Sequence, residues 1–192
     1  MLMIAMPRSA STSILIHISN SFKLRHKQLL HLIPGPKTEK LKSKLKLTRF
    51  LQINYPLLAK LHGDAVIAPK FLFKALSKSK MTLYKQHFTM TNSECKNILF
   101  LYSDISEIIK SYKKLSKQFS NSYDLKELDW DVLANELHQF QNYWFDRASI
   151  VIEKTRYLSE PTYQLKILND VQMTFNLSRF EQTDLPHLRK TL

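Results

Sequence analysis

MLMIAMPRSASTSILIHISNSF, residues 1–22, places an apolar run, a short polar turn and an amphipathic stretch in direct succession. The apolar run, residues 1–6, lacks polar alternation, which is typical of a strand buried on both faces. Ile14 and Ile18 stand one helical turn apart and predict a helix over 11–22. A buried strand that enters a helix through a tight turn indicates an α/β fold.

Strand-like and helix-like segments alternate along the rest of the chain, and the 192 residues are expected to form a single domain. This alternation predicts a three-layer α/β/α architecture with a central parallel sheet. In such sheets, ligands bind at the carboxyl ends of the strands. The predicted strands lie over 64–70, 81–88, 96–104 and 151–158, and the predicted helices over 70–79, 106–119, 129–152 and 162–175.

Positive charge is concentrated in the first part of the chain, which has a net charge of +13 overall. Residues 1–120 carry 21 Lys and Arg against 5 Asp and Glu, whereas residues 121–192 carry 8 against 11. Such an excess predicts an anionic partner: a nucleotide, a nucleic acid, an acidic glycan or a membrane surface. A solvated lysine-rich surface is the alternative. Residues 23–50 are the most basic segment and are expected to form a basic insertion or an acceptor-side segment.

The composition argues against several classes of protein. Cys95 is the only cysteine, which rules out an internal disulfide framework and a cysteine-based zinc site. Gly35 and Gly63 are the only glycines, too few for a Rossmann fingerprint. The apolar run near the start is far below the ~18 residues of a membrane span and lacks the basic lead of a signal peptide. A cytoplasmic protein without a membrane span or a metal site is expected.

The turn after the first strand has the chemistry of an anion site. A strand that enters a helix this way directs several backbone N–H groups to one point, where the helix dipole adds partial positive charge. Ser9, Ser11, Thr12 and Ser13 add hydroxyl groups, and Arg8 adds a planar cation. The Walker pattern of nucleoside triphosphatases is absent. A simple helix cap rich in Ser and Thr explains the same residues, so both interpretations stay open.

The stretch AMPRSASTSI, 5–14, resembles the 5′-phosphosulfate loop of the sulfotransferases, commonly G-x-P-[RK]-S-G-[TS]-[TS]. The resemblance suggests a short and divergent family member with a P-loop NTPase-like fold. Ala10 stands where the loop glycine is usual. The residues that match the pattern are Pro7, Arg8, Ser9, Ser11 and Thr12.

Two residues of LYKQHF, 83–88, resemble the K-x-H segment of cytosolic sulfotransferases. The resemblance implies that His87 is the base that takes the proton of the acceptor. Lys85 would then stabilise charge on the group in transfer. Imidazole suits this role because it titrates near neutral pH. A packed or surface histidine is the alternative for His87.

The stretch 97–115 is similar to the 3′-phosphate segment of the family, a strand followed by R-[ND]-P-x-D-x-x-x-S and a helix. Ser111 falls on the serine of that pattern, but Ser103 replaces its arginine. The resemblance therefore places the 3′-phosphate of the cofactor near Ser103 and Ser111. A different cation would have to replace the arginine, and Lys110, Lys113 and Lys114 are the nearest in sequence.

EKTRYLSEP, 153–161, resembles the family strand that carries Y-E-D-L and precedes a further helix. The match would place Tyr157 near the adenine of the cofactor. Leu158 and Ser159 replace the acidic pair of that strand. A tyrosine packed at the end of a strand is the alternative.

Together these segments imply a sulfotransferase that moves the sulfuryl group of 3′-phosphoadenosine 5′-phosphosulfate (PAPS) to a hydroxyl or amine, without a metal. The acceptor would be a small molecule or a glycan, with a preference for acidic ones. A weak or inactive protein of the same fold that binds an anionic partner is the alternative; a nucleic-acid module and a phosphotransferase rank lower. The implied catalytic residues are His87, Lys85 and Arg8. The implied cofactor-binding residues are Arg8, Ser9, Ala10, Ser11, Thr12, Ser13, Ser103, Ser111 and Tyr157.

Overall fold

The structure is a computed structural model of the chain and describes residues 1–6, 9–28, 80–87, 97–118 and 128–183. The described part alternates strands with helices, as the sequence predicts. Its elements are β1 Leu2–Ala5, α1 Ser11–Ser21, β2 Arg25–Gln28, β3 Thr82–His87, β4 Ile98–Tyr102, α6 Ile105–Gln118, α7 Trp130–Phe145, β5 Ile150–Glu153, α8 Lys154–Ser159 and α9 Pro161–Phe175.

A five-stranded sheet lies at the centre of the fold, in the order β2-β3-β1-β4-β5, and all of its strand pairs are parallel. β1 occupies the middle of the sheet, and every residue from Leu2 to Ala5 is fully buried. The absence of polar alternation in residues 1–6 thus correctly indicated a strand covered on both faces.

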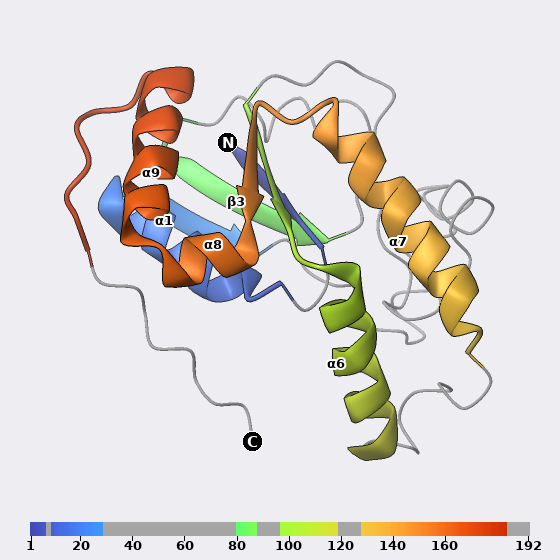
Figure 1. The fold of residues 1–192 in the computed structure, drawn as a ribbon. Helices are drawn as coiled ribbons and strands as arrows, with labels where there is room; N and C mark the ends of the chain where they lie inside the picture. The colour runs from blue at the N-terminus through green and yellow to red at the C-terminus, as the bar shows by residue number, and fades with distance from the viewer. Residues whose placement is uncertain (7–8, 29–79, 88–96, 119–127, 184–192) are drawn as a thin grey trace, which may run out of the picture.

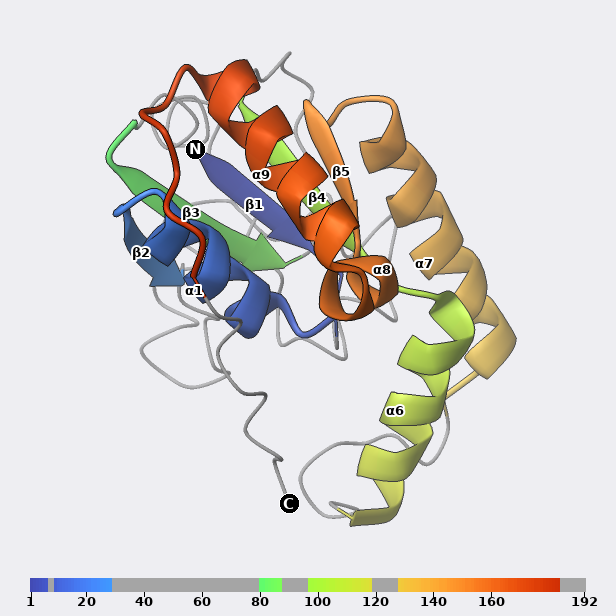
Figure 2. The ribbon, with the colours of Figure 1, turned by 60° about the vertical axis from the view of Figure 1, so that its left-hand side comes forward.

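Helices cover both faces of the sheet, so the architecture is α/β with a central parallel sheet (Figures 1 and 2). On one face α1, α8 and α9 pack on side chains such as Met3 and Leu101. On the other face α6 and α7 pack on side chains such as Ile4 and Phe100. Burial of these apolar faces stabilises the fold by roughly 25 cal/mol per Å² removed from water.

Two of the predicted elements end earlier than the sequence suggested. The helix predicted over 129–152 stops at Phe145, and the chain turns there before β5 begins at Ile150. The β-branched run from Ile150 to Ile152 favours a strand, which pairs with β4. The strand predicted over 151–158 likewise ends at Glu153, and the following residues form α8 instead.

The segment predicted to be a basic insertion contributes a strand to the sheet. Residues 25–28 form β2, which pairs with β3 at the edge of the sheet. Arg25 and His26 are exposed there, as suits an edge strand whose charged side chains reach water. This strand was not predicted from the sequence, where a basic insertion or an acceptor-side segment was expected over 23–50. Residues 29–50 and the elements predicted over 64–70 and 70–79 lie outside the described residues.

No helix in the described ranges is both long enough and apolar enough to span a membrane.

Candidate functional site

The candidate site lies where β1 ends and α1 begins, at the carboxyl edge of the sheet. The Met6 amide donates to the Leu101 carbonyl at 2.9 Å, so the chain stays attached to β4 just beyond the end of β1. Ser9 is buried, and its hydroxyl donates back to the Met6 carbonyl. Ala10 then starts α1 in the left-handed conformation, with φ 50° and ψ 27°. The position where the family pattern has glycine is therefore one whose backbone favours glycine.

Among the described residues, no hydroxyl of the turn caps α1. Ala10 is the N-cap residue of α1, and no side chain of the described residues accepts a hydrogen bond there. The N–H groups of the first turn, including those of Ser11 and Thr12, therefore still point out of the end of the helix. This geometry favours the anion-site interpretation over the helix-cap interpretation, because an effective cap would have used these groups.

Lys85 of β3 reaches this helix end. Its Nζ donates to Ser11 Oγ at 3.1 Å and to Thr12 Oγ1 at 2.9 Å. The residue is only 1 % exposed, and burial lowers the pKa of its ammonium group to about 8. Among the described residues these two hydroxyls are its hydrogen-bond partners, and no carboxylate balances its charge.

A buried ammonium without a counter-charge is costly, because it has lost water and gained only neutral acceptors. At this position the positive end of α1 adds to the same potential. Both effects favour an anion placed against Lys85, Ser11 and Thr12. A phosphate or sulfate oxygen would provide the negative charge that no described residue gives Lys85, and could also accept from the first-turn amides.

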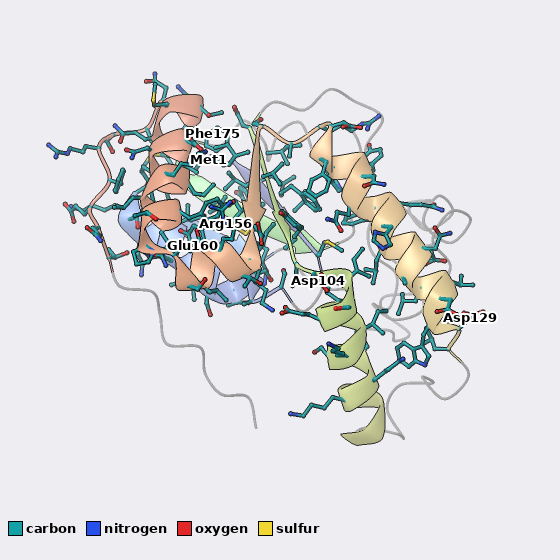
Figure 3. All side chains as sticks on the ribbon, viewed as in Figure 1. Met1, Asp104, Asp129, Arg156, Glu160 and Phe175 are labelled. Atoms are coloured by element: carbon teal, nitrogen blue, oxygen red, sulfur yellow. The ribbon has the colours of Figure 1, made fainter. Side chains whose placement is uncertain are left out.

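The strand ends also place Ser103 at this edge. Ala5 pairs with Leu101, so the chain that follows β4 passes beside the β1–α1 turn. Ser103 is 1 % exposed, and its hydroxyl donates to Glu107 Oε2 at 3.4 Å. Asp104 caps α6 by accepting from the amide of Glu107 at 3.1 Å, and Figure 3 shows it at the start of that helix. Hydrogen bonds from Ser106 and Glu107 lower the pKa of Asp104.

A cation from a distant part of the chain reaches the same point. Lys154 begins α8 directly after β5, and its Nζ lies 2.9 Å from Glu107 Oε2. The register pairs Tyr102 with Glu153, so Ser103 and Lys154 leave neighbouring strands side by side. No signal in the sequence pointed to Lys154, which lies in the middle of the strand predicted over 151–158.

The remaining predicted residues are spread more widely. Ser13 is half-buried in the first turn of α1, and Ser111 is half-buried on α6, about two turns after its start. His87 is the last residue of β3 and pairs with Ala5, which places its backbone at the carboxyl edge. Arg8 lies outside the described residues.

Tyr157 is a core residue of α8, on the face of the sheet that α1 also covers. Its hydroxyl is 2.9 Å from Nδ1 of His17, and Nε2 of His17 is 2.8 Å from the Thr183 carbonyl. Because a carbonyl only accepts, Nε2 donates to it, and when the ring is neutral Nδ1 accepts from the tyrosine hydroxyl. Burial raises the pKa of Tyr157. The packed-tyrosine interpretation therefore describes this residue, which contacts α1 and the chain after α9.

In the described ranges, no three His, Cys, Asp or Glu side chains gather closely enough to hold a metal ion. Comparison of the chain with family models, with curated proteins and with solved structures finds no match.

Proposed function

We propose that this chain is a sulfotransferase of the P-loop-like type, which transfers a sulfuryl group from PAPS to a hydroxyl or amine acceptor. One observation carries the proposal. The buried ammonium of Lys85 lies between the hydroxyls of Ser11 and Thr12 at the uncapped start of α1. A phosphosulfate group has the negative charge and the oxygens that no described residue provides at this point.

The central position of β1 supports the same placement. The chain leaves β1 toward β2 on one side, while β4 and β5 lie on its other side. The adjacent ends of β1 and β4 thus form the switch point at which ligands of open parallel sheets bind. Lys85 reaches the turn after β1, and Ser103 follows β4.

The residues at this edge have complementary tasks in such a transfer. PAPS would supply the sulfuryl group, whose bond to the phosphate oxygen breaks as a bond to the acceptor oxygen or nitrogen forms. Lys85, together with Arg8, stabilises the negative charge left on the phosphate. His87, at the end of β3, takes the proton of the acceptor. Positioning and charge stabilisation supply the catalysis, and no step needs a metal.

A second function is favoured by the cluster at the end of β4. Ser103 is neutral, and the charge of Lys154 is balanced by Glu107 at 2.9 Å. An arginine is expected here for the 3′-phosphate, and its loss weakens the hold on PAPS. The second candidate is therefore a weak or inactive protein of this fold that binds another anion at Lys85, such as a nucleotide or an acidic glycan.

The acceptor of the proposed enzyme is a small molecule or glycan, and the basic charge favours an acidic one. We further propose that it acts in the cytoplasm.

Thermal unfolding with added ligands tests both candidates. We expect 3′-phosphoadenosine 5′-phosphate to raise Tm, whereas ATP with magnesium and a short oligonucleotide leave it unchanged. Lys85→Met should remove the shift, and Lys80→Met, at an exposed position outside the site, should keep it. No shift with the first ligand at millimolar concentration would exclude the sulfotransferase. Binding without transfer to any acceptor would support the second candidate.

A further inference from the structure

The amine of Lys154 lies over the end of β4, in the same way that Lys85 lies over the end of β1. Lys85 starts on β3 and reaches residues that follow β1. Lys154 starts after β5 and reaches the cluster that follows β4. The two long side chains thus reach, from opposite sides, the segments that follow two neighbouring strands, β1 and β4. Two ammonium groups in this arrangement suit one ligand with two separate anionic groups.

Among the described residues, the other cations that follow β4 and β5 pair elsewhere or lie along the exposed part of α6. Arg156 pairs with Glu160 at 3.1 Å and covers the ring of Tyr163, so it belongs to the contact between α8 and α9. The three lysines of α6 that the sequence suggested are exposed, and they begin six residues beyond Asp104. They are Lys110, Lys113 and Lys114.

Glu107 holds the amine of Lys154 in place without enclosing it. Its carboxylate side chain is 47 % exposed, whereas the side chain of Lys154 is 21 % exposed. Ion pairs this open to water are weak. The carboxylate can therefore turn outward, and a phosphate can take its place against Lys154 and the hydroxyl of Ser103. A doubly charged phosphate forms the stronger contact with an ammonium.

We propose that Lys154 binds the second anionic group of the ligand, the 3′-phosphate of a nucleotide whose 5′ group lies at Lys85. Lys154 then supplies the positive charge that Ser103 lacks, and Glu107 forms an ion pair with this amine when no ligand is bound. This inference rests on the proposed function, because it concerns the same ligand. It adds the residue that distinguishes a 3′-phosphorylated nucleotide from one with a free 3′-hydroxyl.

Calorimetric titration with two nucleotides tests this assignment on the full chain. The probes are 3′-phosphoadenosine 5′-phosphate and adenosine 5′-monophosphate, which differ by the 3′-phosphate. We expect the unaltered protein to prefer the bisphosphate at least about tenfold. Lys154→Ala should lose that preference while its affinity for the monophosphate changes less than about twofold, and Lys154→Arg should retain it. Glu107→Gln should strengthen binding of the bisphosphate alone, because it removes the competing carboxylate.

Lys166→Ala is the matched control, since this lysine is exposed on α9 and pairs with Asp170. It should leave both affinities unchanged. If Lys154→Ala loses affinity for both nucleotides equally, the residue only shapes the edge of the sheet. If the preference for the bisphosphate is unchanged, the residue has no role in binding. Either result overturns the inference and leaves the proposed function standing. If the unaltered protein binds neither nucleotide, the proposed function itself fails.

Discussion

Lys85 Nζ lies 2.9 Å from Thr12 Oγ1, although 73 residues separate the two in sequence. The contact links β3 to the first turn of α1 and places a buried charge at the helix end. Because Lys85 is also bonded to Ser11, the three polar groups form one cluster. The cluster lowers the stability of the ligand-free protein and favours the binding of an anion. The first two predictions follow from that contrast.

Replacement of Lys85 by methionine should stabilise the protein and abolish anion binding. Methionine keeps the length and apolar stem of lysine but removes the buried charge, so we expect about 1–2 kcal/mol of added stability. Urea unfolding measures the gain, and a nucleotide titration measures the loss. Lys80→Met should change neither quantity appreciably. A destabilised Lys85→Met protein would show that the ammonium serves the fold and not a ligand.

Anion affinity should fall as the pH rises through about 8. Burial lowers the pKa of Lys85 from 10.5 to about 8, and only the protonated amine binds an anion. The contribution of Lys85 to the affinity is therefore constant below that value, and the affinity falls about tenfold per pH unit well above it. The stability of the ligand-free protein has the opposite pH dependence. Its free energy of unfolding rises between pH about 8 and 10.5, because Lys85 binds the proton more tightly in the unfolded chain.

Binding measured from pH 6 to 10 checks this dependence. Lys85→Arg gives the matched control, because guanidinium stays charged over the whole range. A profile as steep in Lys85→Arg as in the unaltered protein would assign the titration to another group.

Ala10→Gly should stabilise the protein. Ala10 has φ 50°, and a side chain in this left-handed region costs about 1 kcal/mol relative to glycine. For a chain of this size the gain corresponds to a rise in Tm of about 2–4 °C. Ala134→Gly, in α7, should lower Tm by a similar amount because glycine is a poor helix former. A lower Tm for both variants would contradict a left-handed backbone at Ala10.

Tyr157→Phe should destabilise the protein by about 1–2 kcal/mol and leave nucleotide binding unchanged. The change removes only the hydroxyl that lies 2.9 Å from Nδ1 of the buried His17. Chemical denaturation gives the loss of stability, and calorimetry gives the affinity. Weakened nucleotide binding at unchanged stability would place Tyr157 at the adenine after all.

His87→Ala should abolish sulfuryl transfer and keep cofactor binding nearly intact. The imidazole is assigned to proton removal, which contributes typically about 10²–10⁴-fold to a rate. Transfer from PAPS to a panel of hydroxyl and amine acceptors, followed alongside nucleotide titration, separates the two effects. Weakened binding with unchanged turnover would mean that the base is another residue.

The strength of the local signals explains how much of the fold could be predicted. β1, α1, β4, α6 and α9 were all located to within a few residues, because each has an apolar run or a 3.6-residue period of its own. β2 has neither, since its four residues are Arg25, His26, Lys27 and Gln28. Only pairing with β3 makes this segment a strand.

The candidate site divides in the same way. Ser11 and Thr12 were recognisable because a polar turn between a strand and a helix has a local pattern. The partner of that turn was not derivable from local pattern alone, and Lys85 entered only through a resemblance. Lys154 was missed, because the signal for a strand continued past the residue where α8 begins.

The sequence by itself determined the alternation of strands and helices and the polar turn at residues 6–13, because hydrophobic periodicity and turn chemistry act between near neighbours. Only the tertiary structure decided which charges meet at that turn. The parallel register carries Lys85 to Thr12 and Lys154 to Glu107, across 73 and 47 residues. Such contacts depend on which strands become neighbours, and that order is set by burial of the whole sheet and not by any short segment.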